Sequence, residues 1–146
     1  MLAVPAFAAG LAPRDGWRVM DTSHSFADLV KRVEESVKAN KMGIVTQASA
    51  SAGAAAQGFT IPGNKVIGVY RNDFARRMLA ASLAAGIEAP IRLYVTENPD
   101  GKTTLSYKLP STVFAPYFGE GGEDLRKLAV ELDGIFAKIA EEAVKS

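Results

Sequence analysis

The chain has 146 residues, of which 48% are hydrophobic and 23% charged, which is typical of a folded domain rather than a disordered segment. Its formal net charge of +1 argues against a nucleic-acid binder that depends on neutralising many phosphates. The absence of cysteine excludes disulfides, thiolate metal sites and cysteine nucleophiles. A single histidine, His24, excludes multi-histidine zinc sites but not a mixed histidine and carboxylate site.

The first nine residues differ from the rest of the chain. They are apolar and contain Ala6-x-Ala8, the small-residue pattern that precedes a signal-peptidase cleavage point. A basic segment in front of them is missing, so we interpret residues 1–9 as the remnant of a signal peptide that starts upstream. The mature chain is then expected to begin near Ala9 or Gly10 and to be periplasmic or secreted. The alternative is a plain apolar N-terminus on a cytoplasmic protein. No other apolar run is long enough to span a membrane.

The first third of the remaining chain predicts a strand, a helix and a second strand. Residues 17–20 alternate as a short strand does. Ser25 and Asp28 then have the spacing of a helix-capping box. The apolar residues that follow at helical spacing, and so predict one buried face, are Phe26, Leu29, Val30, Val33 and Val37. This helix should end near residues 40–43, and residues 44–48 are a strand candidate.

Residues 49–58 are almost all Ala, Ser or Gly, and they are compatible either with a short helix or with a mobile loop. Residues 65–70 predict a buried strand. Asn72 or Asp73 can cap the next helix. Its expected apolar stripe is Phe74, Met78, Leu79, Ser82 and Leu83, with Gly86 as a plausible end.

The last third predicts a hairpin and a long helix. Residues 91–96 and 103–107 read as strands on either side of the turn sequence at 98–101. A short helical segment is expected at 111–118, a hinge-like loop at 119–122 and a final helix from residue 123. The order of elements predicts a two-layer α+β fold with an antiparallel-leaning sheet and helices on one face, in a single domain over residues 17–146.

Several motifs in this order resemble the family called domain of unknown function 302. They are Gly43-Ile44-Val45 after the first helix and Gly58-x-x-Ile61-Pro62 after the Ala-rich segment. The third strand then ends in Asn72, and Ala75, Arg76 and Met78 follow in a helix. A Pro90-led strand, Asp100-Gly101-Lys102 and Ser106-Tyr107 follow. The resemblance covers roughly residues 19–139.

The resemblance implies a compact domain similar to the β-α-β4-α arrangement of TATA-box-binding-protein-like folds. It also implies a homodimer, and it implies no established activity. Many family members carry a histidine before the Ala-rich segment, where this chain has Ser49 and Ser51. Many also have Asn-Pro where this chain has Asn72-Asp73. A ligand or metal role that depends on that histidine therefore does not transfer.

Four residues are candidates for ligand binding: Asn72, Arg76, Arg92 and Tyr107. The chain is locally basic from Arg71 to Arg92, and an anion can be held where Asn72 and a helix N-terminus offer donors. The alternative for the arginines is that they lie on a solvated helix face and form ordinary ion pairs. The alternative for Tyr107 is that it lies in the core. On the anion hypothesis, Asn72→Ala is predicted to weaken anion affinity.

No catalytic or metal-binding residues are predicted, and the cofactor is unknown. Ser49 and Ser51 lack the Gly-x-Ser-x-Gly elbow of a serine nucleophile, and no pair of titratable groups is legible as acid and base. The favoured function is an accessory domain of the cell envelope that binds a small ligand. The alternative is a homodimeric protein-interaction module without a ligand, and a hydrolase is the least favoured of the three.

Overall fold

The computed structural model describes residues 10–146. Their strands form one antiparallel sheet in the order β1-β5-β4-β3-β2. The strands are β1 (Trp17–Thr22), β2 (Gly43–Ser49), β3 (Asn64–Tyr70), β4 (Ile91–Glu97) and β5 (Thr103–Lys108). The helices are α1 (Phe26–Ala39), α2 (Ala50–Ala56), α3 (Asn72–Ala81), α4 (Pro110–Phe114) and α5 (Phe118–Val144), with short 3-10 helices η1 (Ala84–Glu88) and η2 (Ala115–Tyr117).

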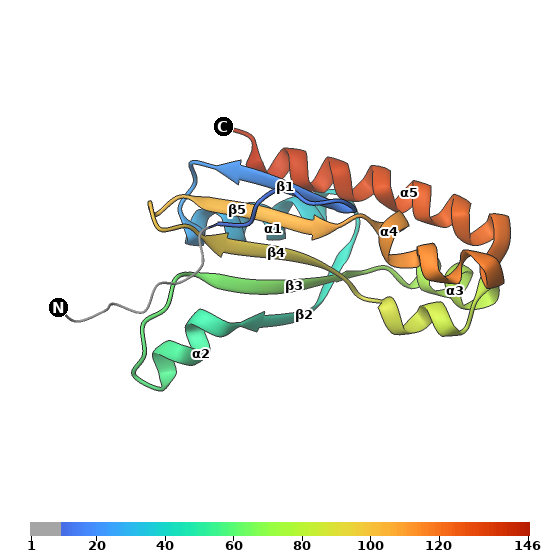
Figure 1. The fold of residues 1–146 in the computed structure, drawn as a ribbon, viewed down its shortest axis with the longest axis horizontal. Helices are drawn as coiled ribbons and strands as arrows, with labels where there is room; N and C mark the ends of the chain where they lie inside the picture. The colour runs from blue at the N-terminus through green and yellow to red at the C-terminus, as the bar shows by residue number, and fades with distance from the viewer. Residues whose placement is uncertain (1–9) are drawn as a thin grey trace.

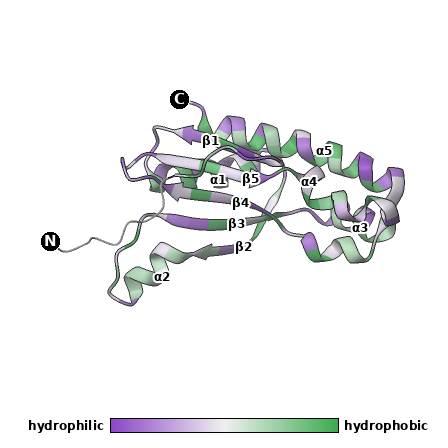
Figure 2. Cartoon of the chain, in the orientation of Figure 1, coloured by the Kyte–Doolittle hydropathy of each residue, from purple (hydrophilic) through white to green (hydrophobic). Residues whose placement is uncertain are grey.

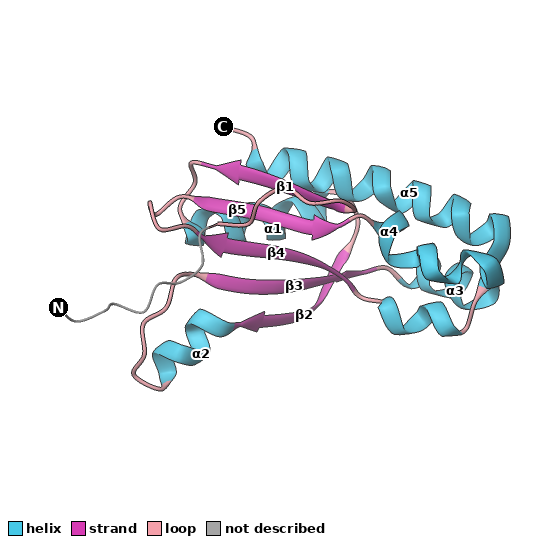
Figure 3. Cartoon of the chain, viewed as in Figure 1, coloured by secondary structure: helices cyan, strands magenta, loops and turns pink. Residues whose placement is uncertain are grey.

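The molecule has two layers, as predicted. The strands lie side by side in one layer, and α1 and α5 pack together behind it (Figure 1, Figure 3). Hydrophilic and hydrophobic residues alternate along the α5 ribbon, which is the pattern of a helix with one buried face (Figure 2). The central strands contribute Leu93, Val95 and Leu105 to the core between the layers, each with no exposed surface.

Helix α1 begins and ends as its sequence predicts. The Ser25 hydroxyl accepts a hydrogen bond from the Asp28 N–H at 3.2 Å. The helix ends at Ala39 with Asn40 as its C-cap, and Lys41 then takes a positive φ of 61°. Leu29, Val33 and Val37 are the residues of the predicted stripe that the sheet and α5 bury most deeply. The predicted apolar face is therefore the face that holds the two layers together.

Polar contacts fix α1 against the end of α5. The Ser36 hydroxyl donates to the Ile139 carbonyl at 2.8 Å, and Arg32 Nε donates to the Ala143 carbonyl at 2.6 Å. His24 Nε2 lies 2.9 Å from the Lys145 carbonyl oxygen. The last carbonyls of a helix have no partner within it, so Arg32 supplies the capping that the end of α5 lacks.

The small-residue segment forms the short helix α2, which was one of its two predicted states. Ser49 caps the helix by accepting from the Ala52 N–H at 3.1 Å. None of its residues is buried, and the helix projects away from the sheet (Figure 1). Side chains of one carbon give this helix almost no apolar area to bury.

The predictions for α3 were partly wrong. Phe74 and Met78 are buried as expected, but Leu79 and Leu83 are 44% and 79% exposed. The helix ends at Ala81, before Leu83, and in η1 it is Ala85 that packs into the core. Arg71 is the residue that precedes the helix, and it makes no side-chain capping bond, so Asn72 lies inside the first turn rather than at the cap.

The predicted loop at residues 119–122 is replaced by a kink. Helix α5 already starts at Phe118, and only Gly122 leaves helical geometry, at φ 60° and ψ −150°. Glycine tolerates this conformation because it has no Cβ. Among residues 10–146, no helix combines the length and the apolar character needed to cross a bilayer.

Leu93→Ala should lower the free energy of unfolding by about 2–5 kcal/mol, because it opens a cavity in a strand that the core fully encloses. Leu83→Ala is the matched control, and its effect should stay within about 0.5 kcal/mol because that side chain is 79% exposed. Urea unfolding followed by circular dichroism measures both. Equal losses in the two variants would contradict the assigned core.

Candidate functional site

The sheet face away from α1 and α5 is the polar one. Along β4, Leu93 and Val95 point into the core, so Arg92, Tyr94 and Thr96 point to the other face. In β5 the same alternation places Thr104, Ser106 and Lys108 on that face. No helix among residues 10–146 packs over the middle of it (Figure 3), although Thr104 and Ser106 have no exposed surface.

A groove of about 630 Å³ lies at one end of this face, where β4 begins and β5 ends. Its floor is formed by β1, β3, β4 and β5, and one wall is formed by α4 and the residues that follow it. The lining residues are Trp17, Val66, Glu88, Ile91, Arg92, Tyr94, Tyr107, Lys108, Thr112, Val113 and Pro116. The volume falls within the range of about 300–1,000 Å³ that small-molecule sites occupy.

Two cationic side chains flank the groove. Arg92 is exposed and lies opposite Gly68 of β3, and Lys108 is exposed and lies opposite Trp17 of β1. Lys108 Nζ stands 5.7 Å from the centroid of the Trp17 ring. Within the part of the chain that the structure describes, neither cation forms an ion pair with a carboxylate. Both charges therefore face solvent in the groove.

The carboxylate of Glu88 is the acidic group of the groove, and it has a partner. The Tyr117 hydroxyl donates to Glu88 Oε2 at 3.3 Å. Partial desolvation and the negative charge of Glu88 raise the pKa of Tyr117, so the phenol stays protonated and remains a donor at neutral pH. One oxygen of the Glu88 carboxylate therefore already accepts a hydrogen bond from Tyr117.

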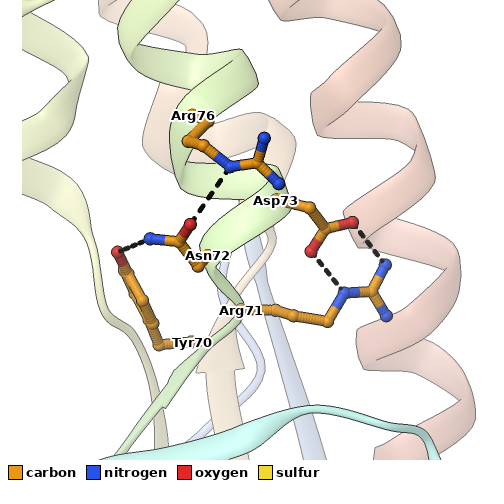
Figure 4. Close-up of polar contacts among 5 residues, drawn as sticks. All are labelled: Tyr70, Arg71, Asn72, Asp73 and Arg76. Atoms are coloured by element: carbon orange, nitrogen blue, oxygen red, sulfur yellow. Dashed lines mark hydrogen bonds and ion pairs between the residues drawn. The ribbon is translucent and has the colours of Figure 1, made fainter.

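The start of α3 holds the second group of polar residues (Figure 4). Arg76 Nε donates to Asn72 Oδ1 at 3.1 Å, and Asn72 Nδ2 approaches the Tyr70 hydroxyl at 3.4 Å. Beside them Arg71 forms a bidentate pair with Asp73, with distances of 2.7 and 3.1 Å. The guanidinium of Arg71 is therefore already paired with the Asp73 carboxylate. The terminal guanidinium nitrogens of Arg76 remain as donors to an anion.

The four predicted ligand residues fall into two places. Asn72 and Arg76 bond to each other at the start of α3, whereas Arg92 and Tyr107 belong to the groove. Tyr107 is only 1% exposed, and its ring lies 5.8 Å from that of Phe136 in the core. Burial raises the pKa of its phenol, an effect that the nearby Arg18 guanidinium opposes. Tyr107 therefore offers the groove its backbone rather than its phenol.

Sequence reasoning did not include Trp17, Glu88 or Lys108 in the ligand site. These residues are far apart in the chain, and the pairing of β1 with β5 and the turn of η1 bring them together. For Lys108 a sequence signal did exist: residues alternate between faces along β5, so Lys108 points to the face opposite that of Tyr107. Across residues 10–146, no three His, Asp or Glu side chains are grouped so as to hold a metal ion.

Comparison with known proteins identifies the family. The family model described as "Domain of unknown function DUF302" matches residues 19–143. The chain belongs to the DUF302 family. A solved structure from Bacillus stearothermophilus, titled as an uncharacterized conserved DUF302 protein, superposes with a TM-score of 0.77 at 20% identity, covering 89% of this chain and 99% of that one. A search of curated proteins found no match.

The DUF302 assignment confirms the sequence resemblance and the α+β fold. At 20% identity, the solved relative shows the fold alone. The candidate binding groups of this DUF302 domain are Arg92 and Lys108 at the groove and the arginine cluster at the start of α3.

Arg71→Gln should raise the pKa of the Asp73 carboxyl toward its ordinary value, because the hydrogen bonds and charge of Arg71 lower it in the folded protein. A lowered folded-state pKa adds stability above the ordinary pKa of an aspartate, and this contribution is lost as the pH falls through the lowered value. Carbon-13 NMR titration of the carboxyl measures the shift.

Arg77→Gln is the control for this titration. Arg77 lies on the same helix but pairs with Glu131 across the α3–α5 contact. The control should leave the pKa of Asp73 where it is. A shift of equal size in both variants would mean that general positive charge, and not the bidentate pair, depresses the pKa.

Proposed function

We propose that this DUF302 domain is an exported accessory domain that binds a small organic anion in the sheet groove. The observation that carries the proposal is the pair of cations, Arg92 and Lys108, at a groove of about 630 Å³. Neither cation has a carboxylate partner among the described residues. Charge-assisted hydrogen bonds from such groups are among the strongest that a site offers to an anion.

The rest of the groove favours a ligand with an apolar or aromatic part. Trp17, Val66, Val113 and Pro116 supply apolar surface beside the cations. Convergent polar groups in a mainly apolar concavity are the usual form of a small-molecule site. Glu88 disfavours a ligand with negative charge spread along its whole length, so the anionic group is expected at one end.

A fluorescent aromatic anion tests this proposal. Anilinonaphthalenesulfonate should bind with higher affinity than neutral phenylnaphthylamine, which has the same aromatic frame without the sulfonate. Arg92→Gln and Lys108→Gln should each weaken binding of the anion about 10-fold, since hydrogen bonds to charged groups contribute roughly 1.5–3 kcal/mol. Lys102→Gln, in the exposed turn at the other end of β5, is the matched control.

Asn72→Ala distinguishes the groove from the start of α3. If the groove holds the anion, this variant binds the probe as the parent does. Loss of affinity in Asn72→Ala, with Arg92→Gln and Lys108→Gln unchanged, would move the site to the arginine cluster and overturn the groove proposal.

A second candidate function is a homodimeric interaction module, and one feature favours it. From residue 43 to residue 64 the chain carries no charged side chain, yet most of this stretch is exposed in β2 and α2. Strand β2 is an edge of the sheet. Natural edges are commonly protected by charge against pairing with another chain. An uncharged edge is suited to pairing with a second copy about a two-fold axis.

Export is proposed from the sequence alone, because residues 1–9 lie outside the described residues. Mass spectra of the protein recovered from its own host test export and dimerisation separately. The denatured mass should correspond to a chain that begins at Ala9 or Gly10, and the native mass to a dimer. An unprocessed chain would contradict export, and a monomer would contradict the dimer.

In the same experiment, Val45→Lys should give a monomer because it places a charge on the β2 edge, where Val45 is 53% exposed. Val130→Lys, on α5 and 67% exposed, is the matched control and should remain a dimer. A dimer in both variants would place the contact elsewhere.

A further inference from the structure

The segment at residues 10–16, here called the arm, lies along β5 on the polar face of the sheet. At one end, Gly10 packs so closely on Asn98 that a Cβ would stand 2.5 Å from Asn98 Oδ1. At the other end, the Gly16 carbonyl accepts from the Leu109 N–H at 2.9 Å. Asn98 and Leu109 flank β5 at its two ends. The arm runs between them without regular structure as far as Arg14, whose carbonyl accepts from the Trp17 N–H in the turn that leads into β1. Figure 1 shows this first described stretch crossing the sheet.

A polar strip runs along this face between the two ends of the arm, and it consists of Thr96, Asn98, Thr104 and Ser106. Thr104 and Ser106 have no exposed surface, although they lie on the face opposite the helices. Thr104 is satisfied, because its hydroxyl bonds Asn98 Nδ2 and Asp21 Oδ1. Three other atoms of the strip are buried without a hydrogen-bond partner within residues 10–146: Thr96 Oγ1, Asn98 Oδ1 and Ser106 Oγ. The fourth such atom among the described residues is the Tyr107 hydroxyl, on the core side of β5.

These unpaired atoms weaken the docking of the arm against the sheet. A buried polar atom without a partner loses the hydrogen bonds that water would give it, and this loss opposes docking. Few contacts of the arm offset this loss. Residues 12–15 are exposed, the Gly16 carbonyl accepts a backbone hydrogen bond from Leu109, and the Arg14 guanidinium lies 5.3 Å from the centroid of the Trp17 ring. Displacement of the arm would therefore release the strip at small cost.

The polar strip continues directly into the groove. Ser106 lies opposite Tyr94, which lines the groove, and Lys108 is the next residue of β5 on the same face. A ligand whose anionic end lies at Arg92 and Lys108 can thus extend along β5 if the arm moves away. The free hydroxyls both donate and accept, and Asn98 Oδ1 accepts, so the best complement is a chain of hydroxyl groups.

We propose that the polar strip is the second half of the ligand site, that the arm is a strap over it, and that a polyhydroxylated carboxylate displaces the strap on binding. The proposal rests on the groove being the anion site and adds the chemical class of the ligand. The anion would pair with the two cations while ligand hydroxyls satisfy the three atoms that the arm leaves without partners.

Trypsin cleavage after Arg14 reports displacement of the arm, because a protease requires a freely extended chain. Lactobionate, a disaccharide acid whose one carboxylate lies at its end, should quench the single tryptophan, Trp17, and should accelerate this cleavage. Lactitol, which has a hydroxymethyl group in place of that carboxylate, should do neither. Tryptophan quenching without faster cleavage would overturn the strap and leave the groove in place.

Thr96→Val tests the strip without any ligand. The substitution keeps the shape of the side chain and removes an unpaired hydroxyl, so the arm should dock better and cleavage should slow about 5-fold. Thr103→Val is the matched control, since that buried hydroxyl bonds Thr22 and the His24 carbonyl and faces the helices. The control should not slow cleavage. An unchanged or faster rate in Thr96→Val would overturn the proposal.

The two proposals fail separately. If anilinonaphthalenesulfonate binds through Arg92 and Lys108 but lactobionate does not bind, the groove stands and the proposed ligand class is wrong. If neither probe binds, the groove itself is wrong. Slower cleavage in Thr96→Val would then still support the strap as a feature of the chain.

Discussion

The burial of one face of the sheet under α1 and α5 is the contact on which the other features of this molecule depend. Leu93, Val95 and Leu105 are fully enclosed there, and burial of such side chains contributes roughly 1.5–3 kcal/mol each relative to exposure. Because strand residues alternate between faces, enclosing these residues fixes where their neighbours point. Arg92, Tyr94, Ser106 and Lys108 are consequently placed on the opposite face.

A single layer of helices leaves the opposite face without a core of its own. The domain meets this constraint in three ways along the sheet. Its arm crosses part of the face, α4 and the residues after it form the wall of a groove, and the β2 side remains open with α2 projecting beyond it (Figure 1). Each of these parts is a place where a ligand, the chain itself or a second copy can complete the structure.

Charge is distributed unevenly between these parts. The two cations, Arg92 and Lys108, gather at the groove, while residues 43–64 carry no charge at all. At the start of α3 the arginines are mostly committed to nearby partners, as the Arg71–Asp73 pair shows. Local basic composition therefore does not distinguish a cation that is already paired with a carboxylate from one that is not.

The sequence by itself determined the elements and the family. The α1 stripe, the Ser25 cap and the β4–β5 hairpin are local patterns, and local patterns are legible because the chain's own neighbours decide them. It misplaced Leu79 and Leu83, because α3 ends at Ala81 and the next residue to enter the core is Ala85 of η1, not Leu83. Only the tertiary structure decided the groove: Trp17 meets Lys108 through the pairing of the first strand with the last. That pairing joins residues more than half the chain apart, and no spacing within the sequence encodes it.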